Sequence, residues 1–202
     1  MTLEMVIIAI VRIAGSLPVL RWPLAGGIIA VVRILGAIPV LWSPFYGGVF
    51  ALLVDQSDLF LMNLLHLGGV HDYQAFDKYL DQVYLGTFLL VALRWPDPER
   101  AVAAGLYAYR LAGFAAFELS GSRTLLLFFP NVFEFWFLLV AAIGHWRPSF
   151  VFTRGRVLGW GAVLLICKEF QEYAVHGARW FDGFTAVEAI EAVWGWLTSP
   201  LR

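Results

Sequence analysis

The sequence predicts an all-α, polytopic transmembrane helix bundle of about six membrane-spanning helices, with interfacial helices at its N- and C-terminal ends. Of the 202 residues, 60% are hydrophobic and only 14% are charged, and the mean hydropathy is +0.75. A folded domain in water cannot bury that much apolar surface. The apolar residues form bounded runs of helical length and do not alternate with polar ones, which favours helices over strands.

This composition predicts an integral protein of a prokaryotic inner (cytoplasmic) membrane, in contact with membrane lipids. The net charge is −1 and no run of basic residues occurs, so a nucleic-acid partner is not indicated. The sequence leaves open whether the chain forms a homodimer or joins a larger membrane complex. Basic residues divide almost evenly between the two sets of connecting segments, so the positive-inside rule leaves the orientation undecided.

The chain begins with an internal repeat. IIAIVRIAGSLPVLRWP (7–23) recurs as IIAVVRILGAIPVLWSP (28–44), which indicates duplication of one helical unit. Residues 1–23 therefore form either an interfacial helix at the membrane surface or an extra helix that crosses it. In the second copy, Arg33 is the candidate for an inward-facing cation.

We expect a single domain over residues 1–202, built around a six-helix bundle at 25–176. The final apolar segment, 183–197, carries acids on one face and Trp on the other, which is typical of an amphipathic interfacial helix. The membrane-spanning helices are expected near residues 25–42, 45–65, 78–95, 99–118, 124–143 and 155–176.

Two acidic pairs stand at the ends of two strongly apolar segments. Asp55 and Asp58 are three residues apart, and Asp77 and Asp81 are four apart, so each pair shares one helical face. Lys78 is adjacent but falls on a different face. Four carboxylates beside apolar runs must be protonated, share a cation or be solvated at an interface, and a shared cation is the functional hypothesis.

Other polar residues lie in the later helices. Arg110 is central in its segment, so an inward contact is expected with the aspartates, Glu118 or Glu134. Pro130 is expected to kink the helix at 124–143, with Asn131 and Glu134 on one face. The stripe Glu169, Glu172 and His176 could bind a metal or form a solvated or ion-paired face, and its role stays open.

At the aspartates the sequence resembles the CDP-alcohol phosphatidyltransferases, which are six-helix membrane enzymes. Their motif is Asp-x2-Asp-Gly-x2-Ala-Arg-x8-Gly-x3-Asp-x3-Asp. This chain keeps the four acids, but the third acid stands 19 positions after the second where the family has 18. The resemblance covers roughly residues 24–90. The family's Gly, Ala, Arg and second Gly are replaced by Leu59, Met62, Asn63 and Tyr73.

The resemblance implies that Asp55, Asp58, Asp77 and Asp81 bind two divalent ions, Mg²⁺ or Mn²⁺, and that Asp81 is the general base. Arg33 and Arg110 are the candidate ligand-binding cations. The leading hypothesis is metal-dependent phosphoryl-alcohol transfer in phospholipid metabolism, on a substrate that the sequence does not identify. The alternatives are a non-catalytic accessory subunit or binding protein that retains the fold, and a proton- or ion-coupled carrier.

Overall fold

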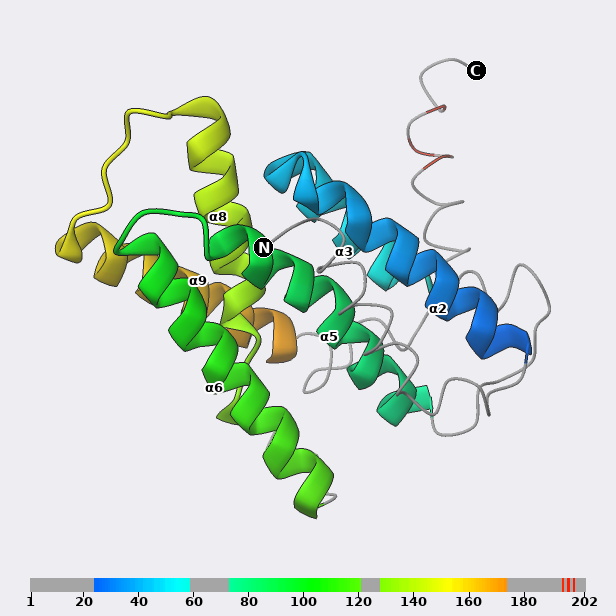
Figure 1. The fold of residues 1–202 in the computed structure, drawn as a ribbon. Coiled ribbons are helices and arrows are strands. Elements are labelled where there is room, and N and C mark those ends of the chain that lie inside the picture. The colour runs from blue at the N-terminus through cyan, green and yellow to red at the C-terminus, as the bar shows by residue number, and fades with distance from the viewer. Residues whose placement is uncertain are drawn as a thin grey trace.

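The computed structural model describes residues 24–58, 73–120 and 128–173, together with positions 194, 196 and 198. All regular elements among these residues are helices, and no strand occurs among them (Figure 1). The elements in chain order are α2 (Leu24–Ala37), the 3₁₀ helix η2 (Ile38–Leu41), α3 (Pro44–Gln56), α5 (Tyr73–Ala92), α6 (Glu99–Ser120), α8 (Val132–Trp146) and α9 (Arg154–Glu172).

The prediction of a polytopic transmembrane bundle is wrong. No helix among the described residues is both long enough and apolar enough to cross a membrane. Helices α2, α3 and α8 have 14, 13 and 15 residues. At about 1.5 Å per residue they span roughly 20 to 23 Å, against a hydrocarbon core of about 30 Å. The longer helices α5, α6 and α9 carry several charged residues each. The predicted inner-membrane location is contradicted for the same reason.

Several sequence expectations fall partly or wholly outside the described residues. These include residues 1–23 and most of 183–197. Within the described part, Pro130 does not kink a helix, because α8 begins only at Val132, after Asn131 as its N-cap residue. Proline lacks the backbone N–H that a continuing helix requires, and here a helix starts just beyond it.

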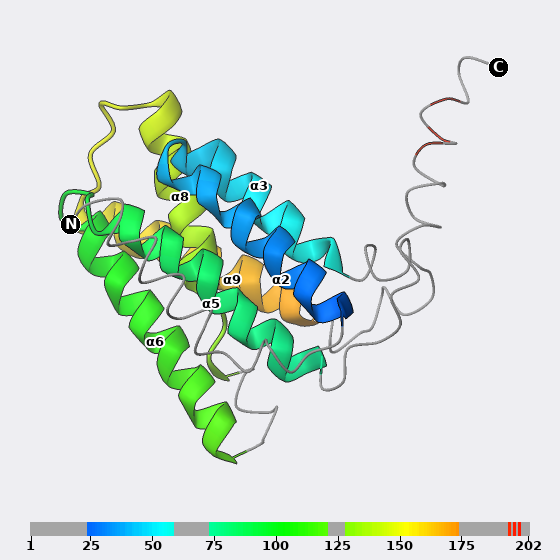
Figure 2. The same cartoon turned by 45° about the vertical axis from the view of Figure 1, so that its right-hand side comes forward.

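The helices pack as a bundle around α5. Helix α5 contacts α2, α3, α6 and α8, while α9 packs along α8. Figures 1 and 2 show α2 and α5 running side by side. The α2–α3 hairpin is tight at Gly47, where an added Cβ would lie 2.5 Å from the backbone of Pro39 and Val40. Only glycine permits this approach of α3 to η2.

Aromatic side chains fill the core between α5 and α8. The rings of Phe88 and Phe137 stack with centroids 4.0 Å apart, and Trp95 stacks on Phe137 at 5.2 Å. The indole Nε1 of Trp136 donates a hydrogen bond of 3.2 Å to the carbonyl of Glu99, which attaches α8 to the start of α6. This packing holds the end of α3 near the beginning of α5, where the four aspartates lie.

Candidate metal centre

The four aspartates meet around one arginine. Arg33, on α2, is only 4% exposed. Its Nε lies 3.5 Å from Asp58 Oδ2, its Nη1 lies 3.2 Å from Asp77 Oδ1, and its Nη2 lies 3.3 Å from Asp81 Oδ1. Nη2 also contacts Asp55 Oδ1. The expected inward position of Arg33 is confirmed, and acids from α3 and α5 share its guanidinium.

Lys78 is a second cation at the same site. Its Nζ lies 2.9 Å from Asp77 Oδ2 and 3.4 Å from Asp81 Oδ2. The prediction that Lys78 lies on a different face is wrong, because Asp81 follows Lys78 by three residues and such residues are neighbours on a helix surface. Burial opposes the charge on Lys78, and the carboxylates of Asp81 and Asp77 outweigh it, so the pKa of Lys78 is raised.

The pKa of Arg33 is raised by a similar balance, in which burial opposes the charge and Asp81, Asp58 and Asp77 outweigh it. Four aspartates face two cations, Arg33 and Lys78, so the formal charge of the group is −2. The site therefore has the charge that one divalent cation would neutralise.

Three of the acids form a group that could hold such an ion. Asp55, Asp77 and Asp81 each offer one carboxylate oxygen, and these oxygens lie within 4.8 Å of one another. Carboxylate oxygens are the ligands that Mg²⁺ and Mn²⁺ prefer. Arg33 contacts the same three carboxylates, so it holds the group together and also competes with an ion for it.

A buried polar layer lies next to the aspartates. The Tyr84 hydroxyl donates a hydrogen bond of 3.0 Å to Glu134 Oε2, and Asn131 Nδ2 donates one of 2.9 Å to the same oxygen. Burial raises the pKa of Glu134, and the charge of Lys168 and the Tyr84 hydrogen bond offset part of that rise. Burial, then the charges of Glu134 and Asp81, raise the pKa of Tyr84 well above its ordinary value.

Sequence reasoning paired Asn131 with Glu134 and missed Tyr84. The missed signal is spacing, because Tyr84 follows Asp81 by three residues and so shares its helical face. Tyr84 thereby connects the α5 acids to α8.

Arg110 is buried, but the structure gives it a different partner from those expected. Its Nη1 donates a hydrogen bond of 2.9 Å to the carbonyl of Phe129. Glu118 instead accepts from the hydroxyl of Tyr79, at 3.0 Å. Arg110 therefore acts on Glu134 through its charge and not through a direct ion pair among the described residues.

The Glu169–His176 stripe is only partly placed. Glu169 is exposed on α9, while His176 and the side chain of Glu172 lie outside the description. Lys168 donates a hydrogen bond of 2.9 Å to Gln171 Oε1.

No protein-family model matches the chain, and no similar curated protein or solved structure was found.

Proposed function

We propose that the chain binds one divalent cation, Mg²⁺ or Mn²⁺, and uses it to transfer a phosphoryl-alcohol group to a hydroxyl acceptor. The observation that carries this proposal is the convergence of Asp55, Asp77 and Asp81, which each offer a carboxylate oxygen within 4.8 Å of the others. The resemblance to CDP-alcohol phosphatidyltransferases supports it, since the same acids belong to that family's motif.

The number of ions in the proposal is one, because Arg33 already supplies a positive charge inside the cluster. Asp58 is 1% exposed and lies against Arg33 Nε, outside the group of three. The Arg33 guanidinium thus neutralises carboxylate charge that a second metal ion would otherwise neutralise. It also fixes the acids of α3 relative to those of α5.

The roles of the other residues follow from their contacts. A bound divalent cation would stabilise the negative charge that develops on the transferring group. Asp81 is the proposed general base, which accepts the proton of the attacking hydroxyl. Its Oδ1 faces Arg33 and its Oδ2 faces Lys78 at 3.4 Å. Because Lys78 is the more exposed cation, it is the one that moves aside to free Oδ2.

A second candidate function is that of a non-catalytic binding protein or subunit that retains the fold. The observation that favours it is the contact of Arg33 with all four carboxylates. In this alternative the guanidinium is a permanent counter-ion, and no metal enters. The replacement of the motif's Gly and Arg by Leu59 and Asn63 is consistent with it.

Metal binding separates the two candidates. Mn²⁺ is titrated calorimetrically into the wild type, Asp77→Asn, Asp81→Asn and a matched control, Asp97→Asn. Asp97 is an exposed carboxylate that pairs with Arg100 at 2.6 Å, outside the cluster. We expect saturable binding by the wild type and the control, with about 2.7 kcal/mol of stabilisation at 100 times Kd. Both cluster variants should lose binding.

Turnover is then followed as cytidine monophosphate release from a CDP-alcohol, with glycerol 3-phosphate as acceptor. Metal-dependent release that disappears in Asp81→Asn supports the transferase. Mn²⁺ binding without release would support a metal-binding protein without this activity. A wild type with no Mn²⁺ response would leave Arg33 as the permanent counter-ion and end the catalytic proposal.

A further inference from the structure

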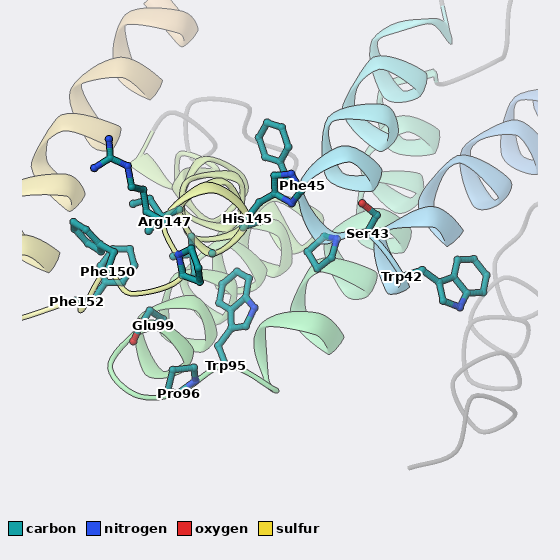
Figure 3. Close-up of a pocket in the computed structure, with 16 residues that line it drawn as sticks. Trp42, Ser43, Phe45, Trp95, Pro96, Glu99, His145, Arg147, Phe150 and Phe152 are labelled. Atoms are coloured by element: carbon teal, nitrogen blue, oxygen red, sulfur yellow. The ribbon is translucent and has the colours of Figure 1, made fainter.

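A cavity of about 450 Å³ lies at the other end of the bundle (Figure 3). It opens to the surface and is lined by the start of α3, the α5–α6 connection, the end of α8 and the loop that follows α8. Helix α3 runs from Phe45 at the cavity to Asp55 in the cluster, which at about 1.5 Å per residue separates the two sites by roughly 15 Å. This volume is in the range of ligand-binding pockets, about 300–1,000 Å³.

The cavity has one buried acid, Glu99, which is 8% exposed. Its Oε2 is buried and has no hydrogen-bond partner among the described residues. Glu99 lies in the first turn of α6, where the helix dipole favours a negative charge but leaves this oxygen without a donor. A buried carboxylate without a donor or cation is costly, so the site favours a ligand that supplies one.

The neighbouring arginines do not supply that cation. Arg100 pairs with Asp97 at 2.6 Å. Arg147 lines the cavity, but Figure 3 shows its guanidinium directed away from Glu99.

The walls of the cavity suit an organic cation with an aliphatic part. Trp95, Phe45, Phe150 and Phe152 contribute aromatic rings. The negative face of such rings attracts cations. One ring of the wall already makes a cation–π contact, because the Arg156 guanidinium lies 4.7 Å from the centroid of Phe150. Between the rings, α8 contributes the apolar side chains of Val140, Ala141 and Ile143.

We propose that this cavity binds a primary alkylammonium ligand. The ammonium group lies against the carboxylate of Glu99 and beside the aromatic rings, and the alkyl chain lies along α8. A primary ammonium fits better than a quaternary one, because only the former has N–H donors for a carboxylate. The proposal does not depend on the metal centre.

The test uses butylammonium chloride as the probe and the full chain, with binding measured by calorimetry at constant ionic strength. Butan-1-ol is the neutral control of nearly the same shape. We expect saturable butylammonium binding by the wild type, at least tenfold tighter than that of butanol. Glu99→Gln, which keeps the shape and removes the charge, should weaken butylammonium binding by tenfold or more.

Two control variants exclude binding to other acids. Asp97→Asn removes a neighbouring exposed carboxylate, and Asp81→Asn removes an acid of the metal centre. Both should bind butylammonium like the wild type. Equal binding of butylammonium and butanol by the wild type, or unchanged binding by Glu99→Gln, would overturn the proposal. Loss of binding in Asp81→Asn alone would assign the probe to the aspartates and overturn it as well.

Discussion

The two ends of the helix bundle are held together by different forces. At one end, the buried guanidinium of Arg33 joins four carboxylates, from α3, from Asp58 just beyond it and from α5. At the other end, the rings of Phe88, Phe137 and Trp95 stack at 4.0 and 5.2 Å. Buried ion pairs add little net stability but are costly when one partner is removed, whereas packed rings contribute in proportion to buried area. The stability of the charged end should therefore depend on bound ions and on the charges of its side chains. The stability of the aromatic end should depend on the volume of its side chains.

The largest effect should come from Arg33→Met at the charged end. Methionine fills part of the space but removes the guanidinium from two buried carboxylates, Asp58 and Asp81, and from two half-buried ones, Asp55 and Asp77. Without divalent metal, we expect a loss of about 3–5 kcal/mol in the free energy of unfolding. Because a competing positive charge is gone, Mn²⁺ should bind about tenfold tighter and restore stability, which urea titration with and without Mn²⁺ measures.

Arg110→Met is the matched control for that variant. Arg110 is also buried, but its hydrogen bond goes to a backbone carbonyl and not to the aspartates. Its loss should destabilise the fold but change the Mn²⁺ response much less than Arg33→Met does, since Arg110 acts on the site only through its charge on Lys78. If Arg33→Met binds Mn²⁺ more weakly than the wild type, Arg33 supports the metal group and does not compete with the ion.

At the aromatic end, Gly47→Ala should have the next largest effect. The new Cβ would lie 2.5 Å from the backbone of Pro39 and Val40, so α3 must move away from η2. Overpacking of this kind costs about 1–3 kcal/mol. Gly86→Ala is the control, since nothing lies within 4 Å of its added Cβ. There alanine should stabilise α5 by about 0.5–1 kcal/mol, and thermal unfolding of both variants checks the difference.

The charged end was the more predictable of the two from sequence. Spacings of three and four put each aspartate pair on one face, and the repeat singled out Arg33. Lys78 was wrongly placed on a different face, although Asp81 follows it by three residues and the two side chains form an ion pair. The cavity around Glu99 could not be predicted, because its walls come from segments far apart in the chain.

The membrane prediction used the composition of the whole chain, while crossing a membrane is a property of each helix. Charges in α5, such as Asp77, Lys78 and Asp81, interrupt the apolar run that the average suggested. Helix α8 is strongly apolar but has only 15 residues. The helical nature of the segments followed from local pattern, whereas their role depended on length and on where charge falls within each one.

Substitution of Glu134 shows whether charge or burial governs the stability of the polar layer beside the aspartates. Its pKa is raised above the ordinary value of 4.5, mainly by burial. The folded state therefore holds the proton more tightly than the unfolded state. This contribution to stability is fully present below pH 4.5 and is lost as the pH rises through the raised pKa. The free energy of unfolding should fall with pH by at most about 1.4 kcal/mol per pH unit from this one group.

Glu134→Gln should remove that slope. Glutamine keeps an oxygen that can accept from Tyr84 and Asn131, but it cannot ionise. The charged groups around this position are Asp81 on α5, Arg110 on α6 and Lys168 on α9. The wild type and the Glu134→Gln variant both retain them. Urea unfolding between pH 4.5 and 8 should show the stability of the wild type falling relative to the variant as the pH rises. Glu118→Gln, at an exposed carboxylate, should leave the pH profile unchanged. Parallel profiles for the wild type and Glu134→Gln would mean that Arg110 and Lys168 offset the burial of Glu134, so that charge governs this layer as it governs the aspartates.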